Sequence, residues 1–276
     1  RSRGLGDVYK RQVLRALRDN TTGGNNTAIG YQSLLSTNTT SNNTAVGWST
    51  LQNNTAVQNT AVGASAGFLN TTGTGLVAIG YQAAYSGSTA TGITAIGYQA
   101  LLNNTGSSNT AIGYQSSYNN TTGGENTALG YQALYSTSVG NANIAIGIQT
   151  LQLNQSGSSN VGIGQNLRSN VNGNSIVAIG RYALDSNTVS NNTAIGTEAA
   201  RSNTTAQGIV AIGYQALSAS VGANNTALGY QALANNTTGV QNHAFGHQAL
   251  LNNTTANNNV AIGTYALVHN TPNTPN

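Results

Sequence analysis

The feature that most constrains this chain is a short phrase, Asn-Thr-Ala-Ile-Gly, that recurs along almost its whole length at a nearly fixed interval. Fifteen copies are present, and consecutive closing glycines are always 16 or 17 residues apart. Periods of about 34 to 45 residues are typical of paired helices and propeller blades, so this interval is too short for either. The closing glycines are Gly30, Gly47, Gly63, Gly80, Gly97, Gly113, Gly130, Gly147, Gly164, Gly180, Gly196, Gly213, Gly229, Gly246 and Gly263.

Such a repeat predicts an all-β fold, a parallel β-solenoid (β-roll) of about 15 coils, with two short strands and two turns per coil. One coil cannot bury its apolar residues alone, but stacked coils form a continuous core. The first strand is expected to end at the closing glycine, and the second to follow it as Tyr-Gln-Ala-Leu, for example at residues 98–101. Strands lie about 4.8 Å apart in a sheet, so fifteen coils predict a rod about 70 Å long.

Alternation within the first strand leaves two registers open. The residue before the closing glycine is always apolar, the residue three before it is mostly Thr or Val, and the residue between them is Ala in fourteen copies. These positions alternate between the faces of a strand. We expect Thr or Val and Ile to point inward and Ala outward, because a uniformly small outward column indicates a closely approaching neighbouring chain. The alternative register places Ala inside a thin coil.

In the expected register the alanine column forms subunit contacts. Its members are Ala28, Ala45, Ala61, Ala78, Ala95, Ala111, Ala128, Ala145, Ala178, Ala194, Ala211, Ala227, Ala244 and Ala261. The same register predicts that aspartate in place of Ile112 or Ile146 buries an unpaired charge and breaks the stack.

Asparagine stands four residues before the closing glycine in eleven of the fifteen copies. Identical asparagine side chains stacked one coil apart can hydrogen-bond to one another as a ladder. The pattern therefore predicts an asparagine ladder along the solenoid. The exceptions are Leu76, Ile93, Ile176 and Ile209.

Charge excludes one class of partner. Only 5% of the residues are charged, against about 25% in typical domains. The net charge of +4 comes from the first 19 residues; the remainder holds three arginines and three acidic residues, which cancel. A basic stripe that could follow a phosphate backbone is therefore missing, and nucleic-acid binding is not expected. The chain has no Cys, which excludes disulfides and thiolate metal sites.

The ends of the sequence read differently from the repeats. Residues 2–12, SRGLGDVYKRQ, match the translation of a transposase-type sequencing adapter, so residues 1–12 are interpreted as a non-native assembly scar and excluded from fold reasoning. We expect the native N-terminus to be missing. Residues 13–22 are expected to be a short lead-in, as a helix or a cap, residues 23–268 the solenoid, and residues 269–276 a disordered or truncated tail.

No apolar run approaches the length of about 20 residues that a transmembrane helix needs. Direct membrane insertion by this fragment is therefore not expected, and no secretory signal is visible at its N-terminus.

The repeats resemble the heads of trimeric autotransporter adhesins of the YadA type, which carry Asn-Ser-Val-Ala-Ile-Gly phrases. Residues 144–147 (Ile-Ala-Ile-Gly) and 260–263 (Val-Ala-Ile-Gly) come closest, and the resemblance covers residues 26 to about 267. It implies a left-handed parallel β-roll with three chains around one axis. The coil here is slightly longer, the Tyr-Gln-Ala-Leu segment is not the usual one, and no stalk, neck or anchor barrel is seen. The repeats also resemble those of bacteriophage tail fibres.

No catalytic, cofactor or metal site is expected, so the chain is not predicted to be an enzyme. His243 and His247 have the spacing of a helical zinc pair, but they flank Gly246 at the strand bend and replace Thr and Tyr of other repeats. Five acidic residues are too few for repeated calcium sites. No serine stands beside a histidine and an acid in any visible pattern.

The best candidate for binding is the residue that follows the closing glycine. If this column faces outward, it forms an aromatic stripe beside a column of glutamines, and could stack on sugar rings or on a host surface protein. The alternative is that the column is buried between chains or only fills the corner of the coil. The aromatic column comprises Tyr31, Trp48, Tyr81, Tyr98, Tyr114, Tyr131, Tyr214 and Tyr230, and the glutamines are Gln32, Gln82, Gln99, Gln115, Gln132, Gln215 and Gln231.

Three functions remain open. The first and favoured one is a structural or adhesive fibre or head domain on a bacterial surface, as a homotrimer that binds a host protein or glycan. The second is a segment of a bacteriophage tail-fibre shaft. The third is a solenoid that binds ice or carbohydrate; ice binding needs a flat outward Thr array, which the expected register does not provide. All three imply an extracellular location, on a cell surface or a virion.

Overall fold

The computed structural model describes residues 15–37 and 39–270, and in these ranges the protein is an all-β parallel solenoid without helix. The predicted fold class is confirmed. Each coil contributes one three-residue strand, and the fifteen strands are β1 (Thr27–Ile29), β2 (Thr44–Val46), β3 (Thr60–Val62), β4 (Val77–Ile79), β5 (Thr94–Ile96), β6 (Thr110–Ile112), β7 (Thr127–Leu129), β8 (Ile144–Ile146), β9 (Val161–Ile163), β10 (Val177–Ile179), β11 (Thr193–Ile195), β12 (Val210–Ile212), β13 (Thr226–Leu228), β14 (His243–Phe245) and β15 (Val260–Ile262).

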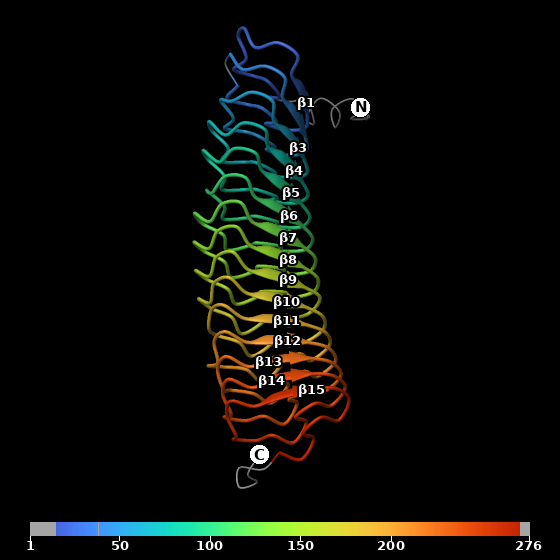
Figure 1. Ribbon diagram of the computed structural model, residues 1–276. Coiled ribbons are helices and arrows are strands. Elements are labelled where there is room, and N and C mark those ends of the chain that lie inside the picture. The colour runs from blue at the N-terminus through green and yellow to red at the C-terminus, as the bar shows by residue number, and fades with distance from the viewer. Residues whose placement is uncertain (1–14, 38, 271–276) are drawn as a thin grey trace, which may run out of the picture. The chain divides into compact units, whose positions relative to one another are not determined.

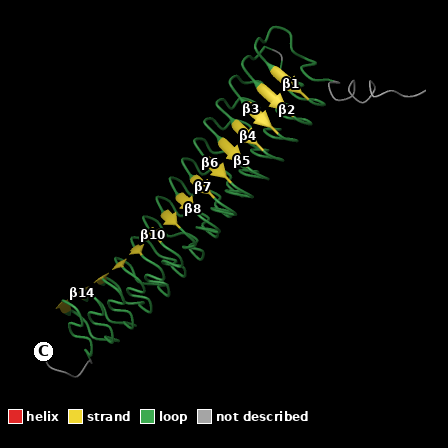
Figure 2. Ribbon diagram, turned by 90° about the vertical axis from the view of Figure 1, so that its right-hand side faces the viewer, coloured by secondary structure: helices red, strands yellow, loops and turns green. Residues whose placement is uncertain are grey.

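The chain divides into two compact units, Arg1–Val139 and Gly140–Asn276. In the first unit, strands β1 to β7 pair in sequence order, all parallel. In the second, β8 to β15 do the same. Within each unit every strand therefore lies beside its equivalent in the next coil, as Figures 1 and 2 show.

The register is the reverse of the expected one. The alanine column points inward: Ala45, Ala111 and Ala145 are fully buried, while the residues on either side of each alanine are half-buried or exposed. The interior is already filled by a leucine column and two asparagine columns, so only a methyl group fits opposite them. The alternative register, with Ala inside a thin coil, is confirmed.

The alanines are therefore internal to their own chain, and their assignment as subunit contacts is wrong. Ala28 in the first strand is half-buried, and the other members are buried. Ile112 and Ile146 lie on the outer face and are half-buried, so aspartate at these positions would not be enclosed in the core.

The second predicted strand is also wrong, because the Tyr-Gln-Ala-Leu segment is a turn. Gln99 and Leu101 have positive φ angles of 53° and 52°, which an extended strand does not allow. The N–H of Ala100 bonds back to the carbonyl oxygen of Gly97 at 3.4 Å. Backbone hydrogen bonds to the neighbouring coils nevertheless continue, from Gln99 N–H to Tyr81 O at 2.9 Å and from Leu101 N–H to Ser116 O at 3.0 Å.

Left-handed backbone costs a non-glycine residue about 1–2 kcal/mol. Leu101, like most members of its column, is completely buried, and burial of a leucine contributes about 1.5–3 kcal/mol. The turn thus places a large apolar side chain in the core at most coils, which offsets the backbone cost.

The closing glycine of each coil has φ between 113° and 141°. At Gly97 an added Cβ would overlap the carbonyl oxygen of Gly113 in the next coil. Both the dihedral angle and the close approach of stacked backbones therefore require glycine here, as the fixed spacing predicts.

The asparagine column forms a ladder, but most of its bonds join side chain to backbone and not side chain to side chain as predicted. The side-chain oxygen of an asparagine before a strand accepts the backbone N–H of the equivalent residue in the next coil, for example Asn43 Oδ1 from Asn59 at 3.0 Å and Asn225 Oδ1 from Asn242 at 2.9 Å. Its Nδ2 donates to a backbone carbonyl across the coil boundary, as Asn59 does to Gly73 at 2.9 Å.

A second asparagine ladder, which the repeat did not predict, lies seven residues after most closing glycines. Here Nδ2 donates directly to Oδ1 of the preceding coil: Asn120 to Asn104 at 2.7 Å, Asn203 to Asn187 at 3.0 Å and Asn270 to Asn253 at 3.0 Å. These side chains are buried. The two ladders satisfy most of the polar groups inside the core, with Asn70 Oδ1 and Asn120 Oδ1 among the exceptions.

The lead-in adds a partial coil. Residues 15–19 form a turn rather than a helix; Arg15 and Leu17 have positive φ like Gln32 and Leu34 of the next coil, and Leu17 N–H donates to Ser33 O at 3.1 Å. At the other end Asn270 still belongs to a ladder, so the coil extends beyond residue 268. The adapter interpretation of residues 1–12 and the proposed tail at 271–276 lie outside the described residues.

Candidate functional site

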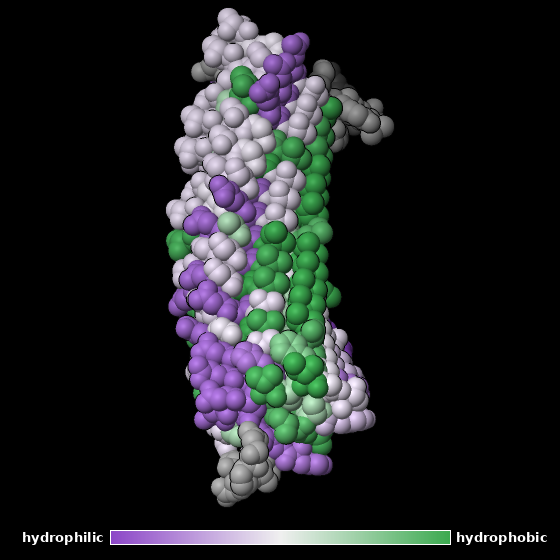
Figure 3. All heavy atoms as spheres, in the orientation of Figure 1, coloured by the Kyte–Doolittle hydropathy of each residue, from purple (hydrophilic) through white to green (hydrophobic). Residues whose placement is uncertain are grey.

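Each unit presents an apolar outer face along its strands. The column before the closing glycine consists of aliphatic residues and Phe245, and it points away from the core, with Ile79 39%, Leu129 42% and Leu228 46% exposed. Thr, Val, Ile and one His form the neighbouring outward column. Figure 3 shows hydrophobic side chains gathered in columns on the side of the strands. We call these two columns the strand face.

The aromatic column lies just beyond the closing glycine and is exposed. In the first unit, the rings of Tyr81, Tyr98, Tyr114 and Tyr131 form a continuous stack with centroid distances of 5.3, 5.2 and 5.4 Å and interplanar angles of 7° to 18°. Each ring is 43–47% exposed. Because their faces pack against one another, the rings inside the stack present edges to solvent.

The glutamine column beside it is also ordered. Nε2 of Gln99 donates to Oε1 of Gln82 at 2.9 Å, Gln115 to Gln99 at 3.1 Å, and Gln132 to Gln115 at 3.2 Å. Every amide in this ladder thus points its nitrogen toward the preceding coil. The turn after the closing glycine places both columns. Its residues alternate between negative and positive φ, as Tyr98, Gln99, Ala100 and Leu101 do.

The second unit repeats the arrangement with different members. Tyr214 stacks on Tyr230 at 5.2 Å, Tyr230 on His247 at 5.1 Å, and His247 meets Tyr265 edge-on at 5.2 Å. His247 thus belongs to the aromatic column, which its position in the repeat could have indicated. Nε2 of Gln248 donates to Gln231 at 2.8 Å and Gln231 to Gln215 at 2.9 Å.

Within each unit the structure therefore stacks most of the predicted aromatic residues on an exposed surface, but this stacking limits what they can bind. Sugar rings cannot stack on the faces inside the stack, since neighbouring tyrosines occupy them. Tyr31 and Trp48 belong to the same column without a ring contact to another described residue. The stripe is interrupted at Ala64, which takes the place of an aromatic residue between Trp48 and Tyr81.

Sequence reasoning missed a charge cluster in the second unit. Five of the six charged residues that follow Asp19 lie in three successive coils: Arg168, Arg181, Asp185, Glu198 and Arg201. An alignment of the successive repeats would have revealed the cluster, because it places these charged residues in neighbouring coils.

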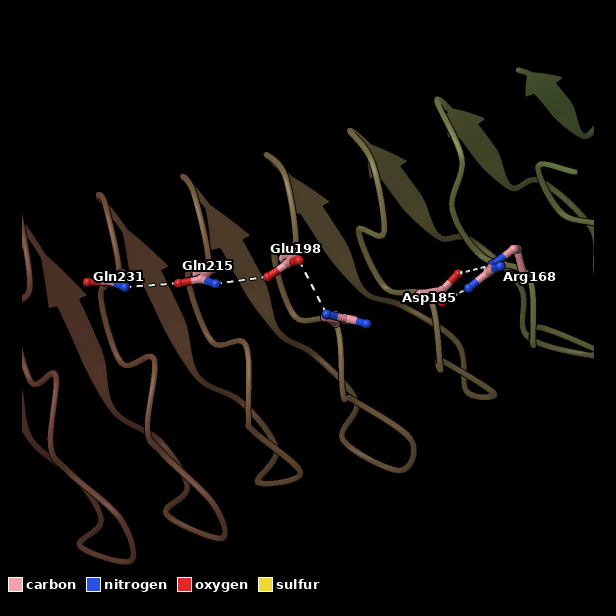
Figure 4. A network of polar contacts seen from close by, with 6 residues as sticks. Arg168, Asp185, Glu198, Gln215 and Gln231 are labelled. Atoms are coloured by element: carbon pink, nitrogen blue, oxygen red, sulfur yellow. Dashed lines mark hydrogen bonds and ion pairs between the residues drawn. The ribbon is translucent and has the colours of Figure 1, made fainter. Parts of the chain in front are cut away.

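Ion pairs and an aromatic ring organise this cluster, and Figure 4 shows the ion pairs. Arg168 donates to both carboxylate oxygens of Asp185, at 2.8 and 2.6 Å, and Arg201 pairs with Glu198 at 3.2 Å. The hydrogen bond to Asp185 holds the pKa of Arg168 above its usual value. The guanidinium groups of Arg168, Arg181 and Arg201 lie 5.1–5.2 Å from the ring centre of Tyr182. Glu198 also accepts Nε2 of Gln215 at 2.8 Å, which closes the glutamine ladder there.

A search of the described residues finds no group of three or more His, Cys, Asp or Glu side chains placed to hold a metal ion. Within the same part of the chain no helix has the length and apolar character to cross a membrane.

Comparisons with protein-family models, with curated proteins and with solved structures find no match to this chain.

Proposed function

We propose that this protein is a non-enzymatic structural and adhesive solenoid of a bacterial cell surface, and that copies of the chain assemble through the strand face. The observation that carries the proposal is the outward column of aliphatic residues and Phe245 along β1 to β7 and β8 to β15, whose members are half-buried or exposed. A soluble single chain seldom exposes a contiguous apolar surface larger than a few hundred Å². Such a surface needs a partner.

The occupant we propose is a second and a third copy of the same chain. The strand face carries no Lys, Arg, Asp or Glu in any of its strands, so two copies can approach without bringing like charges together. The face also repeats once per coil, and only another chain with the same repeat matches that period along its whole length. A homotrimer agrees with the adhesin heads that the repeats resemble.

The remaining surface carries the adhesive role. It consists of Asn-, Thr- and Gly-rich turns together with the exposed aromatic column and the half-buried glutamine column. These groups offer neutral hydrogen bonds and apolar edges, which suit a host protein or a glycan. A shaft segment of a bacteriophage tail fibre would use the same assembly and is the alternative setting. Both imply an extracellular position.

The outward register also favours one different function. Thr94, Thr110 and Thr127 are in the outer column of three successive paired strands, contrary to the expectation that this column points inward. A regular outward Thr array is what an ice-binding face requires. Inhibition of ice recrystallisation by micromolar protein would support this second candidate; inactivity at that concentration would remove it.

The experiment for assembly is the solution mass of residues 13–276 by light scattering, for the parent chain and for Ile96→Glu combined with Ile112→Glu. We expect a parent mass of three chains, and a single-chain mass for the variant with an unchanged far-UV spectrum, because the substituted side chains face outward. Gln99→Glu combined with Gln115→Glu is the control for added charge, since these half-buried residues lie in the turn outside the strand face, and this variant should remain trimeric. A single-chain parent would contradict the proposal.

A further inference from the structure

The aromatic column of the first unit has one missing member. Trp48, Ala64 and Tyr81 occupy equivalent positions in three successive coils, since each follows its closing glycine directly. Tyr81 stacks on Tyr98 on the side of the next coil, at 5.3 Å. The opposite face of its ring points toward the coil of Ala64, whose methyl group provides no ring to cover it.

The glutamine column is interrupted at the same place. Ser49 and Ser65 replace glutamine in the coils of Trp48 and Ala64, and both are buried. Gln82 accepts Nε2 of Gln99, but its own Nε2 has no hydrogen-bond acceptor among the described residues. Since every other donor in this ladder points to the preceding coil, the free donor of Gln82 points toward Ser65.

In the second unit the equivalent glutamine ladder has a hydrogen-bond acceptor for the amide at its end. There Nε2 of Gln215 donates to Glu198 at 2.8 Å, so the donor end of the second ladder is satisfied inside the chain. The first ladder leaves both an aromatic face and an amide donor open toward one coil. This difference distinguishes the position at Ala64 from the equivalent end of the ladder in the second unit.

We propose that the position of the missing ring, between Trp48 and Tyr81 over Ala64, binds one hexopyranose ring of a glycan. Two coil steps separate Trp48 from Tyr81, about 9.6 Å at the usual strand spacing, and aromatic groups stack at centroid distances of about 4.5–7 Å. One inserted ring therefore completes the column at its ordinary spacing. Trp48 and Tyr81 are 56% and 47% exposed, so the position is open to solvent.

The chemistry favours a sugar over an aromatic side chain. A hexose offers an apolar face of C–H groups to Tyr81 and hydroxyl oxygens at its edge. Those oxygens can accept the free Nε2 of Gln82, whereas a hydrocarbon ring would leave this donor unpaired. The inference rests on the proposed adhesive function and names its ligand class.

Trp48 makes the test direct, because it is the chain's single tryptophan. Its fluorescence is followed in residues 13–276 during titration with methyl β-D-glucopyranoside, methyl β-D-galactopyranoside and methyl α-D-mannopyranoside. We expect a saturable change with at least one of them. Ala64→Tyr fills the position with the residue of the neighbouring coils and should weaken binding by at least about tenfold, without loss of the fold.

Thr197→Tyr is the matched control, since it adds a tyrosine at the equivalent position of the second unit and should leave binding unchanged. No saturable response to any of the three sugars, or equal binding by the Ala64→Tyr variant, overturns the inference; so does a response to benzyl alcohol alone. Light scattering on the same samples separates the two proposals. A trimer that binds no sugar contradicts only this site, and a single chain that binds sugar contradicts only the assembly.

Discussion

At the scale of single residues, the second asparagine ladder is interrupted where the next coil does not supply an asparagine. Asn54 Oδ1 accepts Nδ2 of Asn70 and of Asn59, both at 2.9 Å. Asn70 Oδ1 is buried without a hydrogen-bond partner, because the next coil has Gly87 at the equivalent position. A buried acceptor without a partner costs about 1–3 kcal/mol. The interruption is therefore a weak point of the first unit.

Gly87→Asn should repair this interruption and stabilise the protein. A Cβ at Gly87 makes ordinary contacts, at 3.5 Å to Asn104 O and 3.7 Å to Ala84 O, and the new amide can donate to Asn70 Oδ1. We expect a gain of about 1 kcal/mol from the hydrogen bond and the loss of glycine freedom in the unfolded chain. Thermal unfolding followed by circular dichroism measures it. Gly73→Asn, where Cβ would overlap Ala90 O, should destabilise; equal effects of both would contradict the argument.

Core volume is shared between two columns. The leucine column holds a smaller residue at Gly67, Ala84, Ser117 and Ala200, and at three of these the asparagine before the next strand is replaced, by Leu76, Ile93 and Ile209; after Ser117 it remains Asn126. These aliphatic residues are buried. At Gly67 an added Cβ would lie 2.8 Å from Leu51 Cδ2 and 2.9 Å from Leu76 Cδ2, so both leucines already fill that space. Three of the four exceptions to the asparagine ladder thus have a packing cause.

Gly67→Leu and Leu76→Asn should compensate each other. Alone, the first overfills the core, at a cost of about 1–3 kcal/mol, and the second leaves a cavity, at about 2–5 kcal/mol. Together they recreate the leucine and asparagine of the consensus coil, and the coupling free energy should reach about 1–3 kcal/mol. Urea unfolding of the four proteins in the cycle gives this value. Additive effects would show that the two positions do not share one space.

At this scale the sequence predicted the closing glycine and the position of the first ladder, but not the backbone partners of that ladder and not the second ladder. Asn104 and Asn120 stand in Asn-Asn-Thr stretches that are typical of exposed turns. Only the stacking of coils shows that the second asparagine of each pair is buried. The shared core volume was also hidden, because Leu76 and Ile93 appear in the repeat as plain exceptions.

At the scale of the coil, alternation identified the strand but not its inner side. A strand of three residues has one side chain on one face and two on the other, and Thr-Ala-Ile fits either orientation. The space inside the coil decides the orientation of the strand. Leu101 and Asn104 of the same coil already fill the interior, so only the methyl group of an alanine fits there. The turn at residues 98–101 was missed since leucine rarely adopts positive φ.

The ion pair between neighbouring coils is a test at this scale. Arg168 reaches from its coil to both oxygens of Asp185 in the next, and the Asp185 side chain is only 12% exposed. A double-mutant cycle with Arg168→Gln and Asp185→Asn should give a coupling of about 1 kcal/mol, since the pair is bidentate but still partly exposed to water.

The control is the pair of Arg201 and Glu198 within one coil, where the Arg201 side chain is 50% exposed. Its coupling should be smaller and should fall further in high salt. A larger coupling for this pair than for Arg168 and Asp185 would contradict the importance of the contact between coils.

At the scale of the whole molecule, each coil contacts chiefly its neighbours within a unit, so stability should grow as a sum over coils. Deletion of residues 98–113 joins Gly97 to Tyr114 and removes one complete repeat. We expect the shortened chain to keep its far-UV spectrum per residue and to unfold only slightly earlier than the parent.

Deletion of residues 98–105 removes half of that repeat and is the matched control. It joins Gly97 to Gly106, which places turn residues where the leucine column belongs. This variant should lose solenoid structure near the junction. If the two deletions unfolded alike, the coil would not be the structural unit of the chain.

The period predicted the fold class and the number of coils from residues such as Gly97 and Gly113 alone. It could not predict the grouping of charges around Tyr182, because Arg168, Asp185 and Arg201 are far apart in sequence and meet only through stacking. Nor could it predict the open end at Gln82, which depends on the direction in which the amides of the ladder point.

The most direct test of the account compares Ala111→Asp with Ile112→Asp, which place the same charge on opposite faces of β6. The measurement is the thermal midpoint by far-UV circular dichroism, at a concentration where the Ile112→Asp chain is monomeric. Ala111 is fully buried and Ile112 is on the outer face, so the account predicts a loss of several kcal/mol for Ala111→Asp and a near-parental midpoint for Ile112→Asp. The reverse order of the two midpoints would contradict the inward alanine column and, with it, the proposed strand face.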